Sequence, residues 1–490
     1  MSSPIKNTIT LLVALLLLPM LSIAQVTDTV TLTLPAVIAL AKDKSIASKQ
    51  AATVKETKYW QYRSFRSNYQ PQLALTGVLP GYTKSFNQVQ QPDGTILFQP
   101  VHNNNSTLDL SFTQSIAATG GTIFGSTTMQ RFDDFDRKNT LYNGSPYGIG
   151  YSQPLWQFNA LKWNKKIEPL KYYESKQAYI EAMEQVAITA TGYFFDLLLA
   201  QVNLQTAETN LANTMRIQEV ANVKLELGKI SRNEILQLKL EQLKSSKAVG
   251  IATRDLQIAT LNLRTFTGLE QVSYIRLQLP GEAIQAKVPT DKVLAEAYAN
   301  RSDAIAFTRR LAEAKRDVAK ARGDNGINAM LTARLGYSKS AATFSKVYQN
   351  PQDQQLVQLE FTVPILDWGR SKSRTRTARA NLQFTEYAVE QDKQLFVQQI
   401  VTQVTLFDLM KDQLQLTLNA DSIATEKSDI SRERYVLGNL SITDLSIAFQ
   451  EKDQARRDYI AALRDYWSAW YELRYLSLYD FQLDKKIDYK

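Results

Sequence analysis

Two short stretches, one in each half of the chain, have nearly the same sequence: Leu-Gly-Lys-Ile-Ser at 227–231 and Leu-Gly-Asn-Leu-Ser at 437–441. Each is followed three residues later by an acid, Glu234 or Asp444. Glycine can end a helix in the left-handed conformation, and a serine followed by an acid at this spacing can cap the next helix. Each stretch therefore predicts a tight turn between two helices, built on Gly228 and Ser231 in the first half and on Gly438 and Ser441 in the second.

The proline map predicts that long helices flank these turns. Proline is absent between Pro169 and Pro280 and after Pro364, and proline inside a helix costs about 3 kcal/mol. We expect one helix from about Leu161 to Leu227 and another from about Gly369 to Leu437, each about 100 Å long at 1.5 Å per residue. Such helices exceed any globular core, so they must pack mainly against one another. After the first turn, Leu236, Leu240 and Leu243 have coiled-coil spacing.

Five windows alternate apolar and polar residues with a period of two, which predicts strands: 71–79, 107–114, 147–152, 331–337 and 357–363. This pattern suits strands of a membrane barrel with one lipid-facing and one polar side. A half-buried sheet in a soluble protein has the same pattern, and the strands alone leave both interpretations open. No stretch beyond the N-terminus approaches 18 consecutive apolar residues, so a membrane-spanning part would have to be a barrel.

The matching segments indicate an internal repeat. The two turns lie 210 residues apart (438 minus 228), whereas the helix openings near Ala39 and Glu296 lie 257 apart. We expect a first structural repeat at 25–280, with strands at about 71–154, and a second at 281–490, with strands at about 330–364. The drop in offset predicts an insertion of nearly fifty residues within 80–146. Thr119-Gly120-Gly121 looks like a turn there, and Thr122–Gln130 like an additional strand.

The first 24 residues predict export. Lys6 precedes an apolar core centred on Leu11–Leu18, and Ser22-Ile23-Ala24 has small residues at the positions that precede a cleavage site. This is the pattern of a cleavable signal peptide, and the core is too short to span a bilayer. An uncleaved anchor is the alternative.

Composition excludes several classes of function. The 490 residues include no cysteine and a single histidine, His102, which lies in a polar run that we interpret as a solvated loop. Thiolate chemistry is therefore excluded, and a catalytic triad or multi-histidine metal site has almost no basis. The formal charge is +9, but the 57 basic residues are interleaved with 48 acidic ones. We therefore expect no enzyme activity, no metal or cofactor, and no nucleic-acid partner.

The order of the duplicated motifs resembles the TolC-type outer-membrane efflux proteins over nearly all of the chain beyond residue 24. The residues behind this resemblance are 33–41, 69–73, 152–155, 363–369 and the two Leu-Gly-x-Ile/Leu-Ser turns. The resemblance implies an α+β, mainly α fold, with three chains forming one outer-membrane β-barrel that continues into a long α-helical barrel in the periplasm.

The same resemblance implies an export duct of a tripartite efflux or type I secretion system. It would lie in the outer membrane in contact with its lipid, and would work passively with a periplasmic adaptor and an inner-membrane pump. A secreted coiled-coil structural or adhesion protein without a membrane barrel is the alternative. The family has one strand hairpin per repeat, about twelve strands per trimer. The extra hairpin in this chain either widens the barrel or lies outside it.

By the resemblance, the two turns are periplasmic tips that contact the adaptor through Gly228, Ser231, Gly438 and Ser441. Glu234, Asp444 and Tyr435 then become candidate gate residues, because family members close the channel here. Two positions depart from the family pattern, with Ile447 in place of a second acid and Leu440 in place of an arginine. The purely local alternative is that the acids only cap their helices.

Aromatic residues gather in two places. One group lies just beyond the strand ends, where an interfacial belt and ordinary packing are equally good explanations: Trp156, Phe158, Trp163 and Trp368. The other follows helical spacing near the C-terminus, and we interpret it as packing: Tyr459, Tyr466, Trp467, Trp470, Tyr471 and Tyr475.

Overall fold

The protein is described by a computed structural model that covers residues 29–489 except 229, 270–273 and 282–287. The expected signal peptide at 1–24 lies outside these residues. The elements of the first half are β1 (Thr29–Leu32), α2 (Leu34–Lys44), α3 (Ile46–Ser67), β2 (Gln72–Val78), β3 (Tyr82–Gln90), β4 (Ile96–Ser115), β5 (Thr122–Asp134), β6 (Asn139–Leu155), α4 (Ala160–Glu226), α5 (Arg232–Thr267) and β7 (Tyr274–Leu277).

The second half repeats this order with fewer strands. Its elements are α6 (Thr290–Asn300), α7 (Ser302–Asp324), β8 (Asn328–Ala341), the 3₁₀ helix η1 (Phe344–Tyr348), β9 (Gln352–Thr362), α8 (Arg370–Val436), α9 (Ile442–Ser477), β10 (Tyr479–Asp480) and β11 (Lys485–Lys486). The expected mainly α fold with strands is confirmed.

The long helices agree with the expected bounds to within one residue at each end. Both α4 and α8 have 67 residues, and both α5 and α9 have 36. Pro169 lies inside α4 without ending it. These equal lengths support a division of the chain into two repeats at 280/281, which stays a prediction. An 18-residue window of α4 has a mean hydropathy of 1.2, and half of that window is buried, as expected for a helix packed among others.

By its contacts the chain forms two compact units that cut across the sequence halves. The first unit contains the segments that end at Ser45, Thr189–Glu282 and Thr417–Arg464. The second contains Ile46–Ile188, Ala283–Leu416 and the segment from Asp465. The strand sheet belongs to the second unit, and both predicted turns belong to the first.

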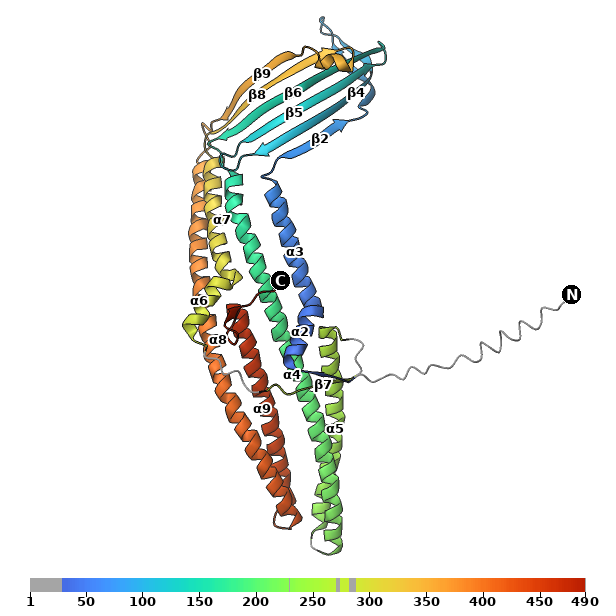
Figure 1. Ribbon diagram of the computed structural model, residues 1–490, viewed down its shortest axis with the longest axis vertical. Helices are drawn as coiled ribbons and strands as arrows, with labels where there is room; N and C mark the ends of the chain where they lie inside the picture. The colour runs from blue at the N-terminus through green and yellow to red at the C-terminus, as the bar shows by residue number, and fades with distance from the viewer. Residues whose placement is uncertain (1–28, 229, 270–273, 282–287, 490) are drawn as a thin grey trace, which may run out of the picture. The chain divides into compact units, whose positions relative to one another are not determined.

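The sheet of the second unit is an antiparallel meander with the order β2-β4-β5-β6-β8-β9 (Figure 1). β2 pairs with the end of β4 that is later in sequence, and β3 pairs with the earlier end. β2 and β3 therefore act together as one interrupted edge strand. All the expected strands are confirmed, including the additional one at 122–130, which is part of β5. β3 is not among the expected strands, because its mainly polar residues lack a clear alternation.

The register gives this sheet two chemically different faces, since directly opposed residues share a face. One face is apolar and solvent-exposed in the single chain, and it carries Leu73, Leu75, Leu108, Leu110, Phe112, Ile123, Tyr147, Ile149, Leu335, Tyr337, Val357, Leu359 and Phe361. The other face is mainly polar, with Thr76, Asp109, Ser111, Ser126, Thr128, Ser152, Thr332, Arg334, Gln358 and Glu360. An exposed apolar face of this extent favours lipid contact over a soluble sheet.

The interpretation of His102 as part of a loop is wrong. Residues 102–106 lie within β4, where His102 is paired with Lys84 of β3. Its Nε2 is 3.0 Å from the Tyr82 hydroxyl, and its Nδ1 is 3.5 Å from a carboxylate oxygen of Asp136. Pairing on both edges holds this polar run in the extended conformation, although its side chains have low strand propensity.

Two of the four tryptophan and phenylalanine side chains beyond the strand ends are not packed within the chain. Trp156 and Trp368 are 74% and 90% exposed and have positive φ values of 60° and 54°. Phe158 and Trp163 are half-buried. The exposure of the first two favours an interfacial position over ordinary packing for them.

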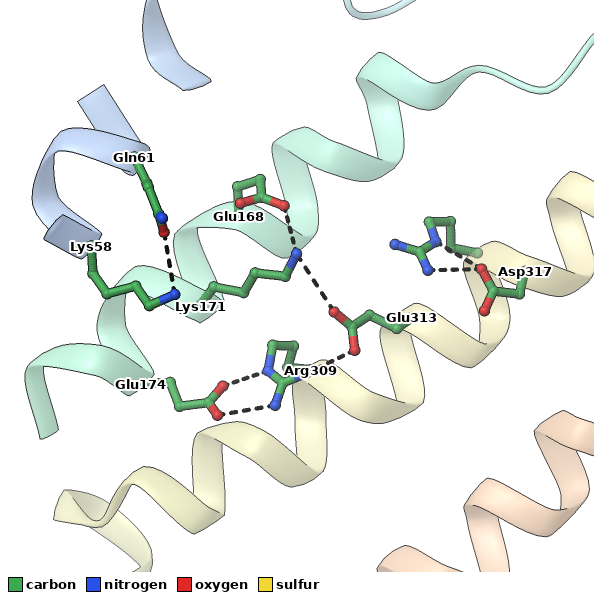
Figure 2. Close-up of polar contacts among 9 residues, drawn as sticks. Lys58, Gln61, Glu168, Lys171, Glu174, Arg309, Glu313 and Asp317 are labelled. Carbon is green, nitrogen blue, oxygen red and sulfur yellow. Dashed lines mark hydrogen bonds and ion pairs between the residues drawn. The ribbon is translucent and has the colours of Figure 1, made fainter. Parts of the chain in front are cut away.

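Ion pairs join the helices of the second unit below the sheet (Figure 2). Arg309 of α7 donates two hydrogen bonds to Glu174 of α4, at 2.5 and 3.0 Å, and one to Glu313 at 2.8 Å. Lys171 of α4 is 2.8 Å from Glu168 and 3.8 Å from Glu313. The hydrogen bond that Arg309 donates to Glu174 contributes most to raising the pKa of Arg309. The bidentate geometry fixes α7 against α4.

The aromatic residues near the C-terminus pack, as predicted. Tyr466 and Trp470 are fully buried and lie with their ring centroids 5.4 and 5.7 Å from that of Phe407. Next to them, Arg474 donates a hydrogen bond to the fully buried Glu184 at 3.0 Å and is also paired with Asp480. These contacts attach the last residues of the chain to α4.

Candidate functional site

The two predicted turns are helical hairpin turns at one end of the first unit (Figure 1). Gly228 and Gly438 have φ values of 68° and 85°, the left-handed conformation that ends a helix. After α8, the Gly438 amide donates to the carbonyl of Tyr435 at 3.0 Å, and the Asn439 amide donates to that of Arg434 at 2.9 Å. These are the two hydrogen bonds of a Schellman motif.

The predicted caps begin the helices that follow. The Ser231 amide donates to Glu234 Oε2 at 2.7 Å, and the Glu234 amide donates to Ser231 Oγ at 3.3 Å, so the capping box is complete. At the second turn, the Asp444 amide donates to Ser441 Oγ at 3.1 Å, and this hydroxyl donates to Asp444 Oδ2 at 2.7 Å. Both serines therefore cap their helices, and both acids contact the cap.

A small apolar cluster joins the two turns to each other. Its buried members come from α4, α5, α8 and α9: Ile217, Ala221, Leu238, Tyr435 and Leu445. Of these five residues, only Tyr435 is a candidate from the sequence. The spacing of four between 217 and 221 was an available signal, but it does not indicate which neighbouring helix the side chains meet.

Tyr435 is held on both its ring and its backbone by α4. The Lys224 Nζ lies 4.9 Å from the centre of the Tyr435 ring and donates a hydrogen bond to the Tyr435 carbonyl at 3.2 Å. Burial raises the pKa of the Tyr435 phenol, and the negative charge of Glu234 raises it further. The structure thus brings Tyr435 and Glu234, two candidate gate residues from different hairpins, into electrostatic contact.

Asp444 lies elsewhere on the tip, in a groove of about 490 Å³ between α8 and α9. Leu440 and Ile447, the two departures from the family pattern, line the same groove. Lys427 and Glu451 join the two helices close by, with 2.5 Å between Nζ and Oε2. Glu234 is not among the residues that line this groove.

A second cavity, of about 210 Å³, lies between α4, α5 and α9 and has Phe449 and Leu445 in its wall. Asn210 Nδ2 donates to Asp453 Oδ2 there at 2.5 Å, while Asp453 Oδ1 is buried without a hydrogen-bond partner in the described part of the chain. Burial raises the pKa of Asp453, partly offset by this hydrogen bond and by the charges of Lys452 and Arg457.

Within the described ranges, no group of three or more acidic or histidine side chains is arranged to hold a metal ion. The tip offers caps, an apolar cluster and grooves between helices, which are features of a contact surface.

Comparison with known proteins agrees with this geometry. Residues 293–477 match the family described as outer membrane efflux protein. Residues 293–477 thus belong to this family.

Three solved structures illustrate the similarity. The outer membrane channel CmeC of Campylobacter jejuni has 15% sequence identity and a TM-score of 0.65, over 93% of this chain and 87% of that one. The outer membrane protein VceC of Vibrio cholerae has 14% identity and a TM-score of 0.63, over 93% and 97%. The open state of the MtrE outer membrane channel of Neisseria gonorrhoeae has 16% identity and a TM-score of 0.61, over 93% and 90%. At these identities the likeness establishes the fold. No curated protein shows significant sequence similarity to this chain.

This efflux protein is accordingly an outer-membrane channel with helices that extend into the periplasm. Channels of this fold are trimeric, and members of the family are transport ducts without catalysis. Of the two functions left open by the sequence, the channel is confirmed and the secreted adhesion protein is set aside.

Gly438→Val should destabilise the tip, because a β-branched residue in the left-handed conformation costs about 1–2 kcal/mol or more. We expect faster hydrogen exchange of amides around 434–445. Gly250→Val is the matched control, since Gly250 lies inside α5 with a negative φ and open space around it. Equal exchange at the tip in both variants would contradict the role of the glycine.

Asp453→Asn should raise the thermal stability of the protein at neutral pH. A carboxyl whose pKa is raised on folding stabilises the protein at low pH, and this contribution is lost as the pH rises through the folded-state pKa. Asn removes the charge and still accepts the hydrogen bond from Asn210. We therefore expect a higher Tm at pH 7 and a smaller gain on acidification than in the wild type. An unchanged Tm–pH profile would show that Asp453 is solvated.

Proposed function

We propose that this chain is the passive, homotrimeric duct of a tripartite efflux or type I secretion system, working with a periplasmic adaptor and an inner-membrane pump. The observation that carries the proposal is that the free edges of the chain expose apolar stripes and an unpaired sheet edge. A neighbouring copy would cover both.

The clearest stripe follows α8 at heptad spacing. Its members are all at least half exposed in the single chain: Leu409, Leu416, Ile423, Ile430 and Leu437. A seven-residue repeat of apolar side chains is the pattern by which one helix packs along another. A second exposed stripe follows α5, with Leu236, Leu240, Leu243, Ile251, Ile258 and Leu261. These stripes support packing of α5 and α8 against neighbouring copies.

The sheet edges support the same arrangement. β2 and β9 end the meander, and neither has a partner on its outer side among the described residues. Unpaired backbone groups cost several kcal/mol each in hydrocarbon, so strands cross a bilayer only in closed barrels. Pairing β9 of one copy with β2 of the next would close the sheet, with its apolar face toward the lipid.

The tip supports a role in docking the adaptor. Chain neighbours apart, no atom of the described residues lies within 4 Å of a Cβ built on Gly228 or Gly438, which leaves both turns open to a partner. We therefore assign adaptor contact to these glycines and to the neighbouring Ser231 and Ser441. The gate would comprise Glu234 and Tyr435, which already interact within one chain, together with Asp444.

The expected closing network differs from the family pattern. Leu440 and Ile447 are apolar residues in the groove of Asp444, which the charged Lys427 and Arg434 also line. In a trimer, three copies of Asp444 around the axis would repel one another unless cations or protons share the site.

Ile423→Glu should weaken the trimer, since it places a charge in the stripe that the neighbour would cover. Losing this burial costs about 2 kcal/mol at each of the three interfaces. We expect a smaller native mass by light scattering in detergent and loss of export. Thr425→Glu is the matched control, because residue 425 lies about 200° around the helix from 423. Trimers of unchanged stability in both variants would contradict the packing of α8 on a neighbour.

Asp444→Asn should weaken inhibition of the channel by divalent or trivalent cations in planar bilayers. Glu234→Asn should have a smaller effect, because the Glu234 carboxylate is already bonded to the Ser231 amide. If Asp444 only caps α9, the substitution would change stability by about 0.3–1 kcal/mol and leave cation block unaltered. Unchanged block at matched ionic strength is therefore the result that would remove Asp444 from the gate.

A further inference from the structure

The additional hairpin of the first repeat is built into the middle of the sheet. β5 pairs with β4 from Ser115↔Thr122 to Asn103↔Asp134, and with β6 from Thr122↔Ser152 to Asp134↔Asn139. One irregularity, between Ser126 and Thr128, interrupts the second ladder. Figure 1 shows β5 between β4 and β6. A hairpin lying outside the wall would lack one of these two ladders.

The apolar face continues onto the first residues of β5. Ile123 lies opposite Tyr151 of β6, and Gly125 lies between Phe112 of β4 and Ile149 of β6. On the other face, Ser126 lies opposite Ser111. Over residues 123–126, β5 therefore has the same division into an apolar and a polar side as the strands that flank it, whereas further along the strand Thr127 and Arg131 lie on the apolar side. A strand inside the lumen or outside the wall would not need this division.

The number of strands per repeat is consequently unequal. The first repeat contributes the combined edge β2–β3 and then β4, β5 and β6, whereas the second contributes only β8 and β9. Each chain thus supplies six strands to the wall, and three chains supply eighteen. With one hairpin per repeat, as the second repeat has, three chains would supply twelve.

We propose that the β4–β5 hairpin widens the outer-membrane opening to an eighteen-strand, water-filled pore that admits bulky hydrophilic cargo of polymer size. The proposal rests on the trimeric duct proposed above. Barrel diameter grows roughly linearly with strand number, so the opening is about 1.5 times as wide as that of a twelve-strand barrel. Barrels of 16–18 strands leave an aqueous channel, and the polar face of the sheet lines it. Selection by size then takes place at the helical tip and not in the outer membrane.

The first test asks whether β5 is part of the wall, and the chain is well suited to it because it contains no cysteine. Single substitutions Ser126→Cys and Ile123→Cys place a thiol on the polar and the apolar face of β5. In intact cells, a membrane-impermeant maleimide should label the first and leave the second unlabelled until the protein is denatured. Ser111→Cys and Leu110→Cys on β4 are the matched controls. Equal labelling at 123 and 126 would overturn the proposal that β5 is part of the barrel wall. It would leave the proposed function intact, because a trimer that binds the adaptor would still be a duct.

The second test measures the width of the opening from the extracellular side, where the tip does not limit entry. Gln358→Cys, on the polar face of β9, is labelled with polyethylene-glycol maleimides of increasing size in the intact chain and in a variant lacking residues 96–138. This deletion joins the β3 end of the edge strand to β6 and leaves four strands per chain. The largest reagent that reacts should have a radius about 1.5 times greater in the intact chain.

Equal cut-off radii in two correctly assembled trimers would overturn the widening. If the deletion variant does not assemble, the labelling pattern of β5 decides alone, because a β5 with both faces accessible excludes an eighteen-strand wall. Failure of the trimer itself would be detected separately by the native mass, so the two proposals can fail independently.

Discussion

The structure depends on one constraint: a helix of 67 residues cannot bury its apolar side in a globular core and must bury it along another helix. The equal lengths of α4 and α8, and of α5 and α9, agree with this constraint, because the two hairpins pack against each other next to their turns. The cluster around Tyr435 and Leu238 is where the two hairpins meet. The two turns next to that cluster are open to a partner. Long helices also expose apolar side chains that only a neighbouring helix can bury, and α5 and α8 carry such stripes.

The sheet, like the long helices, has apolar surface that the chain itself does not bury. Its strands bury no common core, since the side chains of one face remain exposed throughout β2 and β9. The sheet is held together instead by the hydrogen bonds between its strands. Small residues also leave room for large side chains of neighbouring strands. A Cβ on Gly150 would lie 2.3 Å from the Phe124 ring and one on Gly148 would lie 3.3 Å from Arg334. Glycine at these positions allows larger side chains on neighbouring strands to lie flat on the polar face.

Much of this architecture could be predicted from the sequence because its signals are local. The long stretches without proline indicated α4 and α8, although Pro169 lies inside α4, and the Gly-x-x-Ser-x-x-acid pattern predicted both turns and caps. What local patterns do not specify is which element meets which. The pairing of Asn210 with Asp453, and of Lys224 with Tyr435, joins residues more than 200 positions apart. His102 was misplaced for the same reason, since a polar run becomes a strand only when neighbours on both sides supply hydrogen bonds.

The unpaired edges of β2 and β9 have a consequence for the biogenesis of the protein. A single six-strand sheet would carry two rows of unsatisfied amides and carbonyls into hydrocarbon, a cost of several kcal/mol for each group. A lone copy therefore has no stable inserted state. Insertion into the bilayer and association of the subunits have to occur as one coupled event, and a chain waiting for its partners must be kept in the aqueous compartment with its edges shielded.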